Sequence, residues 1–475
     1  MFRKKTHIHF VGIGGIGMSA IAKILMQRGY IVSGCDNNVT QKNVIDLQIL
    51  GCQIHQGNNQ PLCDDHSINV LVYTSDVNPH HPEITRARER AIAVISRGQM
   101  LAELTRTKYT IGVAGSHGKT TTTSLIAHIF MHAQLDPTVI VGGHLKSISS
   151  NSQAGSSEFL ITETDESDRS LLYLFPTIAV LTNIDREHLN TYRNLQDITE
   201  TFRRFLQKVP FYGKAIVCID DLQIRSLLPL DEIPTTTYGK SKEAEWSYND
   251  LTLHADHSTY ELIYKEIALG YVKVPIAGHH NVLNSIAALA AALETGMSFE
   301  IASRALATFC GVDRRFTFRG IVQGAEVFDD YGHHPTEISC TSLVARKRAR
   351  NKLIVIFQPH RYSRTATLWK EFVELLATYQ ADHIIVTDLY AASEAAVPGI
   401  TSAELVAQAK KLNPYAPVTY VPLDPDFKSL QATIRSLANE GDLILLQGAG
   451  NITHLSTFLL ASPTLQEPAA HEKAQ

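Results

Sequence analysis

The sequence predicts an α/β protein of about three domains, each built on a largely parallel sheet. Two observations carry this prediction. Apolar runs of strand length alternate along the chain with stretches of helical apolar spacing, and two glycine-rich loops each follow such a run and open a helical stretch. The length of 475 residues allows about three domains, and the 44% of apolar residues is ample for their cores.

Three blocks follow from this alternation. In the first block, a helix is expected at Ile16–Gln27, and strands at His7–Val11, Ile31–Gly34 and Val70–Thr74. The second block opens at about Thr107, with a helix at Thr121–Met131 and strands at Tyr109–Ala114, Glu158–Thr162, Ile178–Thr182 and Ala215–Ile219. The third begins near Gly320, with strands at Lys352–Phe357, His383–Thr387 and Leu443–Leu446. The tail after Ala461 is rich in Pro, Ala and Glu, and we expect it to be frayed.

The composition excludes several classes of partner. The formal net charge is -4 with no long basic run, so we expect no nucleic-acid partner. No stretch of 18 apolar residues occurs, so we expect no membrane insertion. The six cysteines form no C-x-x-C pair, which is typical of a reduced, cytoplasmic chain without a zinc knuckle. The basic start, Met1–Lys5, imitates a secretory signal, but it runs directly into a phosphate loop and is interpreted as part of the fold.

The first glycine loop is Gly12-Ile-Gly14-Gly15-Ile-Gly17, which fits G-x-G-x-x-G between a strand and a helix. Its glycines let the backbone approach a diphosphate, and the helix N-terminus supplies free N–H groups. Asp36 ends the next strand, where a dinucleotide fold carries its ribose-binding acid. Alone, this motif favours a nicotinamide-dependent dehydrogenase, or a tight turn that binds nothing.

The second loop is Gly115-Ser-His-Gly118-Lys119-Thr120-Thr121, again between a strand and a helix. A strict P-loop has a glycine where this chain has Val113, so the loop is a shortened variant. Lys119 is expected to neutralise the β- and γ-phosphates, and Thr120 to bind Mg²⁺. A dehydrogenase has no use for this loop, and a simple kinase has none for the first. The pair therefore indicates an enzyme that uses ATP on a substrate carrying a nucleotide-like diphosphate.

Polar runs follow several of the predicted strands. Glu163-Thr-Asp165-Glu166-Ser-Asp168 and Asn183-Ile-Asp185-Arg186-Glu187-His188 end neighbouring runs of the second block, where ligands of parallel sheets bind. A carboxylate and an imidazole are expected to meet there near Mg²⁺, although single residues among them have the alternative role of helix N-caps. In the third block, His360, Arg361 and Arg364 form a basic cluster suited to an anionic substrate. A transition-metal site at the His-His pairs is not favoured.

Together these motifs resemble the Mur ligase family over nearly the whole chain, to about Asn451. The resemblance rests on His7-Ile-His-Phe-Val-Gly-Ile-Gly-Gly-Ile-Gly-Met-Ser19, Ser96-Arg-Gly-Gln-Met-Leu-Ala-Glu-Leu104, Asp165-Glu-Ser-Asp168, Asp329-Asp-Tyr-Gly-His-His-Pro335, Gln358-Pro-His-Arg361 and Gly448-Ala-Gly-Asn451. It implies a Rossmann-like UDP-substrate domain at 1–106, a P-loop ATPase-like domain at 107–318 and a Rossmann-like amino-acid-binding domain at 319–475. Within the family, the chain is most similar to the members that join L-alanine to UDP-N-acetylmuramate.

The resemblance also implies roles for individual residues. The expected ATP-binding residues are Gly115, Ser116, His117, Gly118, Lys119, Thr120, Thr121, Asn281, Arg315 and Asp330. The expected UDP-substrate residues are Gly14, Gly15, Gly17, Met18, Ser19, Asp36, Thr74 and Ser75. Mg²⁺ would be held by Thr120, Glu163 and His188, and the expected catalytic residues are Lys119, Glu163, His188, His333, His360, Arg361 and Arg364. Departures from the family pattern are Ser116 for Thr, Asp76 for a small residue, and Ala277 for Pro or Gly.

The expected reaction activates the substrate carboxylate with ATP as an acyl phosphate, which the amine of L-alanine then attacks. The amine must be neutral, so a base is needed, and His333 and His360 are the candidates. We expect a cytoplasmic monomer or weak homodimer. The nearest rival is the sibling ligase that attaches a recycled tripeptide to the same UDP-substrate. More distant rivals are a nicotinamide-dependent oxidoreductase and a non-enzymatic ATP-gated binding module.

Overall fold

A computed structural model describes residues 6–57, 67–74, 77–78, 80–188, 191–392 and 394–461. The chain divides into two compact units, Met1–Asp313 and Arg314–Gln475. The first unit holds two sheets and the second holds one. None of the helices in the described ranges is long and apolar enough to cross a membrane. The predicted frayed tail after Ala461 lies outside the described residues.

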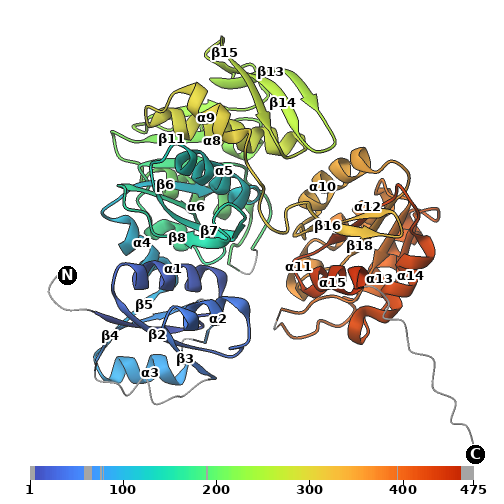
Figure 1. The fold of residues 1–475 in the computed structure, drawn as a ribbon, viewed down its shortest axis with the longest axis horizontal. Coiled ribbons are helices and arrows are strands. Elements are labelled where there is room, and N and C mark those ends of the chain that lie inside the picture. The colour runs from blue at the N-terminus through green and yellow to red at the C-terminus, as the bar shows by residue number, and fades with distance from the viewer. Residues whose placement is uncertain are drawn as a thin grey trace, which may run out of the picture. The chain divides into compact units, whose positions relative to one another are not determined.

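The N-terminal sheet has five parallel strands in the order β3-β2-β1-β4-β5. The strands are β1 (His7–Val11), β2 (Ile31–Asp36), β3 (Gln53–Gln56), β4 (Ile68–Tyr73) and β5 (Ala93–Ser96). The helices are α1 (Ile16–Gln27), α2 (Lys42–Ile49), α3 (Pro82–Glu89) and α4 (Arg97–Thr105). Helices α1 and α3 lie on opposite faces of this sheet (Figure 1). The strand order reverses at β1, and ligands of open parallel sheets bind at such a reversal.

The central sheet has ten strands in the order β15-β14-β13-β12-β11-β10-β6-β9-β7-β8. Its parallel centre consists of β6 (Tyr109–Ala114), β7 (Thr138–Leu145), β9 (Phe159–Glu163), β10 (Ile178–Leu181), β11 (Lys214–Cys218) and β12 (Thr235–Tyr238). Strand β13 (Trp246–Leu253) pairs in parallel with β12, and antiparallel pairing then extends the two ends of the sheet through β14 (Ser258–Tyr264), β15 (Ile267–Val274) and β8 (Ser150–Gln153). Strand β6, which precedes the second glycine loop, and β9, which leads into the first acidic run, are neighbours in the parallel part of the sheet.

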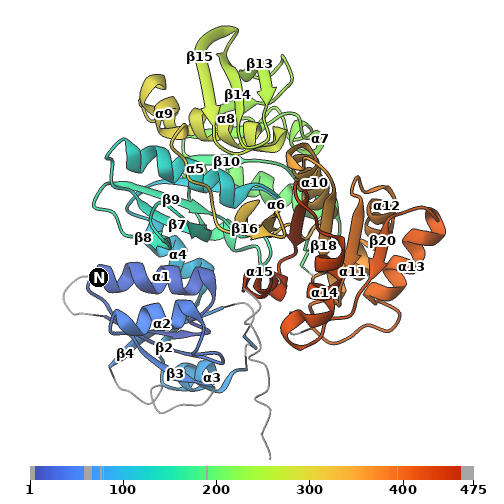
Figure 2. The same ribbon diagram turned by 45° about the vertical axis from the view of Figure 1, so that its right-hand side comes forward.

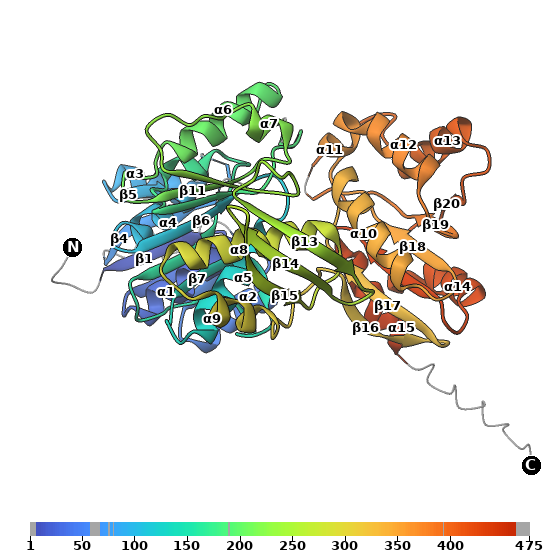
Figure 3. The ribbon, with the colours of Figure 1, turned by 90° about the horizontal axis from the view of Figure 1, so that it is seen from above.

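Helices cover both faces of the central sheet (Figure 3). They are α5 (Lys119–His132), α6 (Leu195–Leu206), α7 (Leu222–Arg225), α8 (His279–Glu294) and α9 (Phe299–Leu306), with a short 3₁₀ turn at Ser170–Tyr173. Helices α6 and α7 lie on one face, and α8 and α9 lie on the other. The alanine-rich helix α8 is buried along most of its length, which suits close packing against α5.

The sheet of the second unit has six strands in the order β16-β17-β21-β18-β19-β20. They are β16 (Thr317–Val322), β17 (Ala325–Asp330), β18 (Leu353–Phe357), β19 (His383–Val386), β20 (Val418–Tyr420) and β21 (Leu443–Gln447). All neighbours are parallel except β16 and β17. The helices are α10 (Pro335–Arg348), α11 (Tyr362–Thr367), α12 (Trp369–Thr378), α13 (Ser402–Leu412), α14 (Lys428–Leu437) and α15 (Leu455–Leu460).

Two hydrophobic layers enclose that sheet. Along β18, Leu353, Val355 and Phe357 belong to the cluster shared with α12 and α13. The residues between them, Ile354 and Ile356, belong to the cluster shared with α14 and α15. A strand that is apolar on both faces in this way is typical of a buried parallel sheet. The sheet therefore separates α12 and α13 from α14 and α15 (Figure 2).

The predicted strands and helices are present, with ends that move by at most a few residues. Strand β2 continues from the predicted end at Gly34 to Asp36, and α5 begins at Lys119 rather than Thr121. The boundary between the two compact units falls between Asp313 and Arg314. Strand β16 begins at Thr317. We therefore propose to end the central domain at Asp313, and we keep the N-terminal boundary between α4 and β6.

Candidate active site

The first glycine loop leaves the N-terminus of α1 open to an anion. Gly15 caps α1 without a side-chain bond, and the first turn contains no acid. The backbone N–H of Gly14 donates to Oδ2 of Asp36 at 2.8 Å. A Cβ on Gly14 would lie 1.7 Å from Nε2 of Gln41 and 2.8 Å from Oδ2 of Asp36, so any larger residue there would displace both side chains. Asp36 thus supports the loop, because its carboxylate is bonded to the loop's own backbone.

The other predicted UDP-substrate residues surround this loop in different ways. Met18 and Ser19 are buried in the core, and the Ser19 hydroxyl donates to the Ile16 carbonyl at 3.0 Å. Any contact from these two residues to a ligand would therefore come from their backbone. Thr74 packs against Gly12, where an added Cβ would lie 2.8 Å from Cγ2 of the threonine. Ser75 lies outside the described residues.

The second loop connects β6 to α5 and depends on two glycines. Gly118 caps α5 at φ 82°, in the left-handed region that favours glycine. A Cβ there would lie 2.6 Å from Oδ1 of Asn284, and one on Gly115 would lie 2.1 Å from Oγ1 of Thr182. The loop is also fastened to the segment after β10, because the His117 N–H donates to Oδ1 of Asn183 at 2.8 Å.

Two predicted ATP-binding residues of this loop have partners in the following segment. The Asp185 N–H donates to Oγ of Ser116 at 2.8 Å, and Nε2 of His117 lies 3.0 Å from Oδ2 of Asp185. The Ser116 hydroxyl therefore joins the two segments, a function that a threonine hydroxyl would also supply. Thr121 is half-buried in the first turn of α5.

The Lys119 ammonium is saturated by three acceptors. It donates to the carbonyls of Gly115 at 2.5 Å and Ser116 at 3.0 Å, and to Oε1 of Glu166 at 2.7 Å. Burial alone would lower the pKa of Lys119, but Glu166 and the neighbouring acids outweigh it and hold the pKa above its ordinary value. Lys119 is therefore charged at neutral pH, and a phosphate that bound it would replace one of these acceptors.

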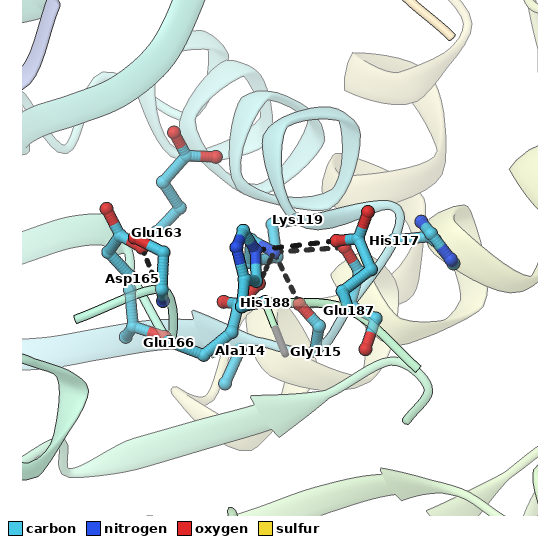
Figure 4. A network of polar contacts seen from close by, with 12 residues as sticks. Ala114, Gly115, His117, Lys119, Glu163, Asp165, Glu166, Glu187 and His188 are labelled. Carbon is cyan, nitrogen blue, oxygen red and sulfur yellow. Dashed lines mark hydrogen bonds and ion pairs between the residues drawn. The ribbon is translucent and has the colours of Figure 1, made fainter. Parts of the chain in front are cut away.

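Two groups of side chains whose oxygen and nitrogen atoms could bind a metal ion lie around this lysine (Figure 4). In one, the Thr120 hydroxyl donates to Oε2 of Glu163 at 2.8 Å. In the other, Nε2 of His188 lies 3.4 Å from Oε1 of Glu166 and 3.5 Å from Oε2 of Glu187. The predicted metal ligands Thr120, Glu163 and His188 therefore divide between two groups, with Lys119 electrostatically coupled to acids of both.

The donor set fits a divalent cation such as Mg²⁺. Hydroxyl and carboxylate oxygens are its preferred ligands, and Glu163 and Thr120 offer both. Among the described residues, Oε2 of Glu166 is buried without a hydrogen-bond partner, and an orphaned buried carboxylate oxygen is costly unless something binds it. Burial would lower the pKa of His188, but its contacts with Glu166 and Glu187 raise that pKa above its ordinary value.

The predicted ATP contact Asn281 lies in the first turn of α8 and is connected to the second loop. Oδ1 of Asn281 accepts from Nδ2 of Asn284 at 3.2 Å, and Oδ1 of Asn284 accepts from the Thr122 hydroxyl at 3.2 Å. The two asparagines share one helix face, as the sequence predicts. Asn281 also donates to the Ala277 carbonyl at 2.7 Å. This chain of bonds positions Asn281 relative to α5.

In the second unit, Asp330 is a buried, fully engaged carboxylate. It accepts from the N–H groups of Phe316 and Gly332, each at 2.9 Å, and from the Thr341 hydroxyl at 3.1 Å. Burial raises the pKa of Asp330, although Arg315 opposes that rise. The Arg315 guanidinium lies over the Tyr331 ring, 5.3 Å from its centroid. These predicted ATP contacts thus form one cluster at the end of β17.

The predicted amino-acid site brings His333, His360, Arg361 and Arg364 together. The two imidazole rings lie 5.7 Å apart, and the His360 ring stacks on Tyr390 with an interplanar angle of 9°. Nη1 of Arg364 lies 3.2 Å from Nδ1 of His360. A guanidinium can only donate, so Nδ1 must accept and the proton of His360 must reside on Nε2.

The electrostatics of this cluster make His360 a weak base. Burial, His333 and the nearby arginines lower the pKa of His360 to about 3. Such a group cannot take a proton from an alkylammonium at neutral pH, which leaves His333 as the stronger of the two candidates. His333 is held by its N–H bond to Oε2 of Glu337 at 3.0 Å. Nη1 of Arg361 lies 3.8 Å from Oε1 of Glu394, so its cation is only loosely paired.

Several residues of these clusters were not singled out from the sequence. Glu166 and Glu187 hold Lys119 and His188, and both belong to acidic runs that follow strands. The acidic runs were recognisable in the sequence, but the sequence did not show which acid of each run faces Lys119. Tyr390, which stacks on His360, follows β19, and the carboxyl end of a parallel strand was itself a usable signal.

Comparison with known proteins gives consistent results along the chain. The family model described as Mur ligase family, catalytic domain, matches residues 7–109; the Mur ligase middle domain matches 113–292; and the Mur ligase, glutamate ligase domain, matches 314–450. A UDP-N-acetylmuramate--L-alanine ligase of Syntrophus aciditrophicus is 43% identical over 461 residues, which cover 97% of this chain and 94% of that protein.

Two solved structures are similar over most of the chain. The crystal structure of a UDP-N-acetylmuramate-alanine ligase from Thermotoga maritima has a TM-score of 0.79 at 27% identity, and covers 95% of this chain and 98% of that one. A murein peptide ligase from Psychrobacter arcticus has a TM-score of 0.71 at 24% identity, and covers 96% and 98%. The second likeness bears on the fold alone.

Proposed function

This chain belongs to the Mur ligase family, and on that premise we propose that it joins the carboxylate of UDP-N-acetylmuramate to the amine of L-alanine at the expense of ATP. The single observation that carries the proposal is the pair of phosphate loops, Gly12–Gly17 and Gly115–Thr121, within one compact unit. One loop suits the diphosphate of a UDP-sugar, and the other suits ATP. Relatives that carry the alanine-ligase name, at 43% identity over nearly the full chain, support the choice of substrates.

The activation step follows from the central site. The UDP-substrate carboxylate attacks the γ-phosphorus of ATP, the bond to the β-phosphate oxygen breaks, and an acyl phosphate and ADP form. Lys119 exchanges one of its present acceptors for a phosphate oxygen and offsets the charge of the transferring group. Thr120, Glu163, Glu166 and His188 are the residues that would hold Mg²⁺. When bound, that ion would neutralise phosphate oxygens.

The amide-forming step belongs to the second unit. The amine of L-alanine attacks the acyl carbon, and inorganic phosphate leaves. His333 is the candidate for the group that accepts the amine proton, because His360 is too weak a base. Arg361 and Arg364 are suited to the alanine carboxylate, and Tyr331 and His333 to a small pocket around its methyl group. A reaction that consumes ATP and a UDP-sugar is expected in the cytoplasm.

The tripeptide-recycling ligase is the rival within the family. The opening Gly12-Ile-Gly-Gly-Ile-Gly-Met18 argues against it, and relatives at 43%, 44% and 45% identity carry the alanine-ligase name. A nicotinamide-dependent oxidoreductase would leave the second loop, Lys119 and the acids around it without a use. The opening motif and the relatives therefore favour the alanine ligase over the tripeptide ligase, and the loop pair favours it over the oxidoreductase.

The test measures phosphate release by the full chain with ATP and Mg²⁺, with and without UDP-N-acetylmuramate, across L-alanine, glycine, L-serine and the L-Ala-D-Glu-diaminopimelate tripeptide. We expect release only when the UDP-substrate and an amino acid are both present, with L-alanine preferred. Glycine and L-serine should be used poorly, because apolar fit discriminates by only about 1–3 kcal/mol per methylene. A preference for the tripeptide would instead assign the chain to the sibling ligase.

A further inference from the structure

Arg97 reaches the surroundings of both phosphate loops. A Cβ placed on Gly17 would lie 3.1 Å from Nη1 and 3.3 Å from Cδ of Arg97, so this side chain lies directly against the first loop. On its other side, Nη2 donates to Oδ2 of Asp165 at 2.8 Å and lies 3.5 Å from Oδ2 of Asp168. Asp165 closely follows Glu163 and immediately precedes Glu166, the partner of Lys119.

A cation at residue 97 is unfavourable for the stability of the fold. Arg97 is the first residue of α4, within the Ser96–Gln99 capping box, and a cation at a helix N-terminus opposes the helix dipole. Its side chain is only 16% exposed, so the charge is also largely removed from water. Asp165 and Asp168 compensate for both effects. A neutral side chain would avoid these costs, which points to a use for the charge itself.

Asp165 lies between the residues that contact the two loops. Its Oδ2 accepts from Arg97 at 2.8 Å and its Oδ1 accepts from the Ser167 N–H at 2.8 Å, and the next residue, Glu166, accepts from Lys119 at 2.7 Å. Arg97 adjoins the first loop, and Lys119 belongs to the second. A displacement of Arg97 therefore moves Asp165, and a displacement of Lys119 moves Glu166. Because these two acids are adjacent in the chain, each displacement reaches the other.

Close packing makes the connection stiff. A Cβ on Gly98 would lie 2.3 Å from Cβ of Ser170, so α4 lies against the turn that follows the acidic segment. The N–H of Ser170 in turn donates to Oδ1 of Asp168 at 2.9 Å. The first loop has its own direct contact with the central sheet, because Nδ2 of Asn151 donates to the Ile16 carbonyl at 2.7 Å. Interiors packed this tightly transmit small shifts.

We propose that Arg97 is a positioning residue that couples binding of the UDP-substrate to binding of ATP, a role that rests on the proposed function. A diphosphate at the N-terminus of α1 adds negative charge beside Gly17, and a nucleotide triphosphate adds it beside Lys119. Arg97 is a fixed cation that screens these two anions from each other and holds the Asp165–Asp168 segment in place. Without it, the two ligands oppose each other.

The experiment measures the dissociation constant of UDP-N-acetylmuramate by calorimetry, with and without a saturating non-hydrolysable ATP analogue and Mg²⁺, and then the reverse pair. Linkage requires the same coupling factor in both directions. In Arg97→Met, we expect this factor to shift toward antagonism by about fivefold or more. Arg97→Lys should lie between, because lysine keeps the charge but lacks the fork that grips two acids. Arg225→Met is the matched control, since it removes the remote Arg225–Glu243 pair and should leave the factor unchanged.

The outcomes separate this inference from the proposed function. If the wild-type chain binds both ligands and Arg97→Met leaves their coupling factor unchanged, the role of Arg97 is refuted while the ligase assignment stands. If the wild-type chain does not bind the UDP-sugar, the ligase assignment itself fails. Should Arg97→Met not fold, Arg97→Lys and Asp168→Asn take its place, because each weakens the grip on the acidic segment without removing a buried cation. An unchanged factor in both would also refute the proposal.

Discussion

The Lys119 ammonium lies 2.7 Å from Oε1 of Glu166, in a pair whose glutamate is only 3% exposed. With the Gly115 and Ser116 carbonyls, this carboxylate occupies all three protons of the ammonium. The lysine must therefore exchange one of these bonds when a phosphate binds. None of its three acceptors belongs to the first glycine loop, so its effect on ATP can be measured apart from UDP-substrate binding.

Lys119→Ala should abolish ligation while leaving UDP-substrate binding within about twofold. Removing a phosphate-stabilising group typically lowers turnover by roughly 10²–10³-fold, and Lys119 is not part of the first glycine loop. Calorimetry with UDP-N-acetylmuramate and a coupled assay for ADP measure the two effects. Loss of both functions in a protein whose thermal unfolding is still cooperative would refute this separation.

Gly142→Ala should break the hydrogen bond between Thr120 and Glu163 although neither of these two residues is substituted. A Cβ at this position would lie 1.7 Å from Oε1 of Glu163, so the carboxylate must move. We expect turnover to fall by roughly tenfold or more and the Mg²⁺ requirement to rise. Gly296→Ala is the control for general strain: Gly296 has a φ of 86°, which disfavours alanine and which Gly142 lacks, but no atom lies within 4 Å of its Cβ position. Equal losses in both variants would indicate general destabilisation instead.

His188 should make stability depend on pH above its ordinary pKa of 6.5. Its folded-state pKa is raised, so its stabilising contribution is fully present below 6.5 and is lost as pH rises through the folded value. His188→Gln should therefore lower the free energy of unfolding more at about pH 6 than at about pH 9. A constant difference across this range would contradict the predicted sign.

The measurement can be confined to the unit that contains His188. The two tryptophans of the chain are Trp246, in the central sheet, and Trp369, in the second unit. On a Trp369→Phe background, tryptophan fluorescence during urea unfolding reports on Trp246 alone. Both the wild-type and the His188→Gln chains should be compared on that background.

His360 should not appear in the pH dependence of turnover near neutrality. Burial, His333 and the neighbouring arginines lower its pKa to about 3, so its imidazole is already neutral at pH values far below those of the assay. We expect His360→Gln to lower turnover without moving the acidic limb of the kcat/KM profile, whereas His333→Gln should remove or shift that limb. A limb that shifts only in His360→Gln would reverse the two roles.

Removing the guanidinium of Arg361 or Arg364 should affect L-alanine far more than ATP. These side chains flank His360, and a guanidinium can hold a carboxylate by two bonds. We expect the KM for L-alanine to rise by roughly tenfold or more, since a charge-assisted bond contributes about 1.5–3 kcal/mol, with the KM for ATP nearly constant. Initial rates over both substrates give this ratio. Unchanged alanine KM values in both variants would remove the arginines from the amino-acid site.

The sequence located the loops better than it located their partners. Strands β1 and β6 were predictable because each is an apolar run that stops at a glycine loop. In contrast, Glu163, Asp165 and Glu166 follow one another, and only the backbone direction after β9 decides that Glu163 meets Thr120 while Glu166 meets Lys119. Strand β15 was missed because it is mostly exposed or half-buried and lacks a continuous apolar run.

Contacts between distant segments were equally out of reach. His360 and Tyr390 are joined by an isolated parallel bridge between the segments that follow β18 and β19. The sequence places both residues after strands, but the stacking that helps to bury His360 depends on how those two strand ends meet. The low pKa of His360 could therefore not be derived from the basic residues beside it in the sequence.

The contact between Gly118 and Asn284 ties the evolution of the phosphate loop to a helix distant in the chain. Oδ1 of Asn284 occupies the space that any side chain at residue 118 would enter, and it also accepts the Thr122 hydroxyl bond. A directed-evolution library that varies the loop alone will therefore recover few alternatives at residue 118. Even a smaller residue at 284 removes only the steric part of this restriction, because the φ of 82° at Gly118 still disfavours any side chain there.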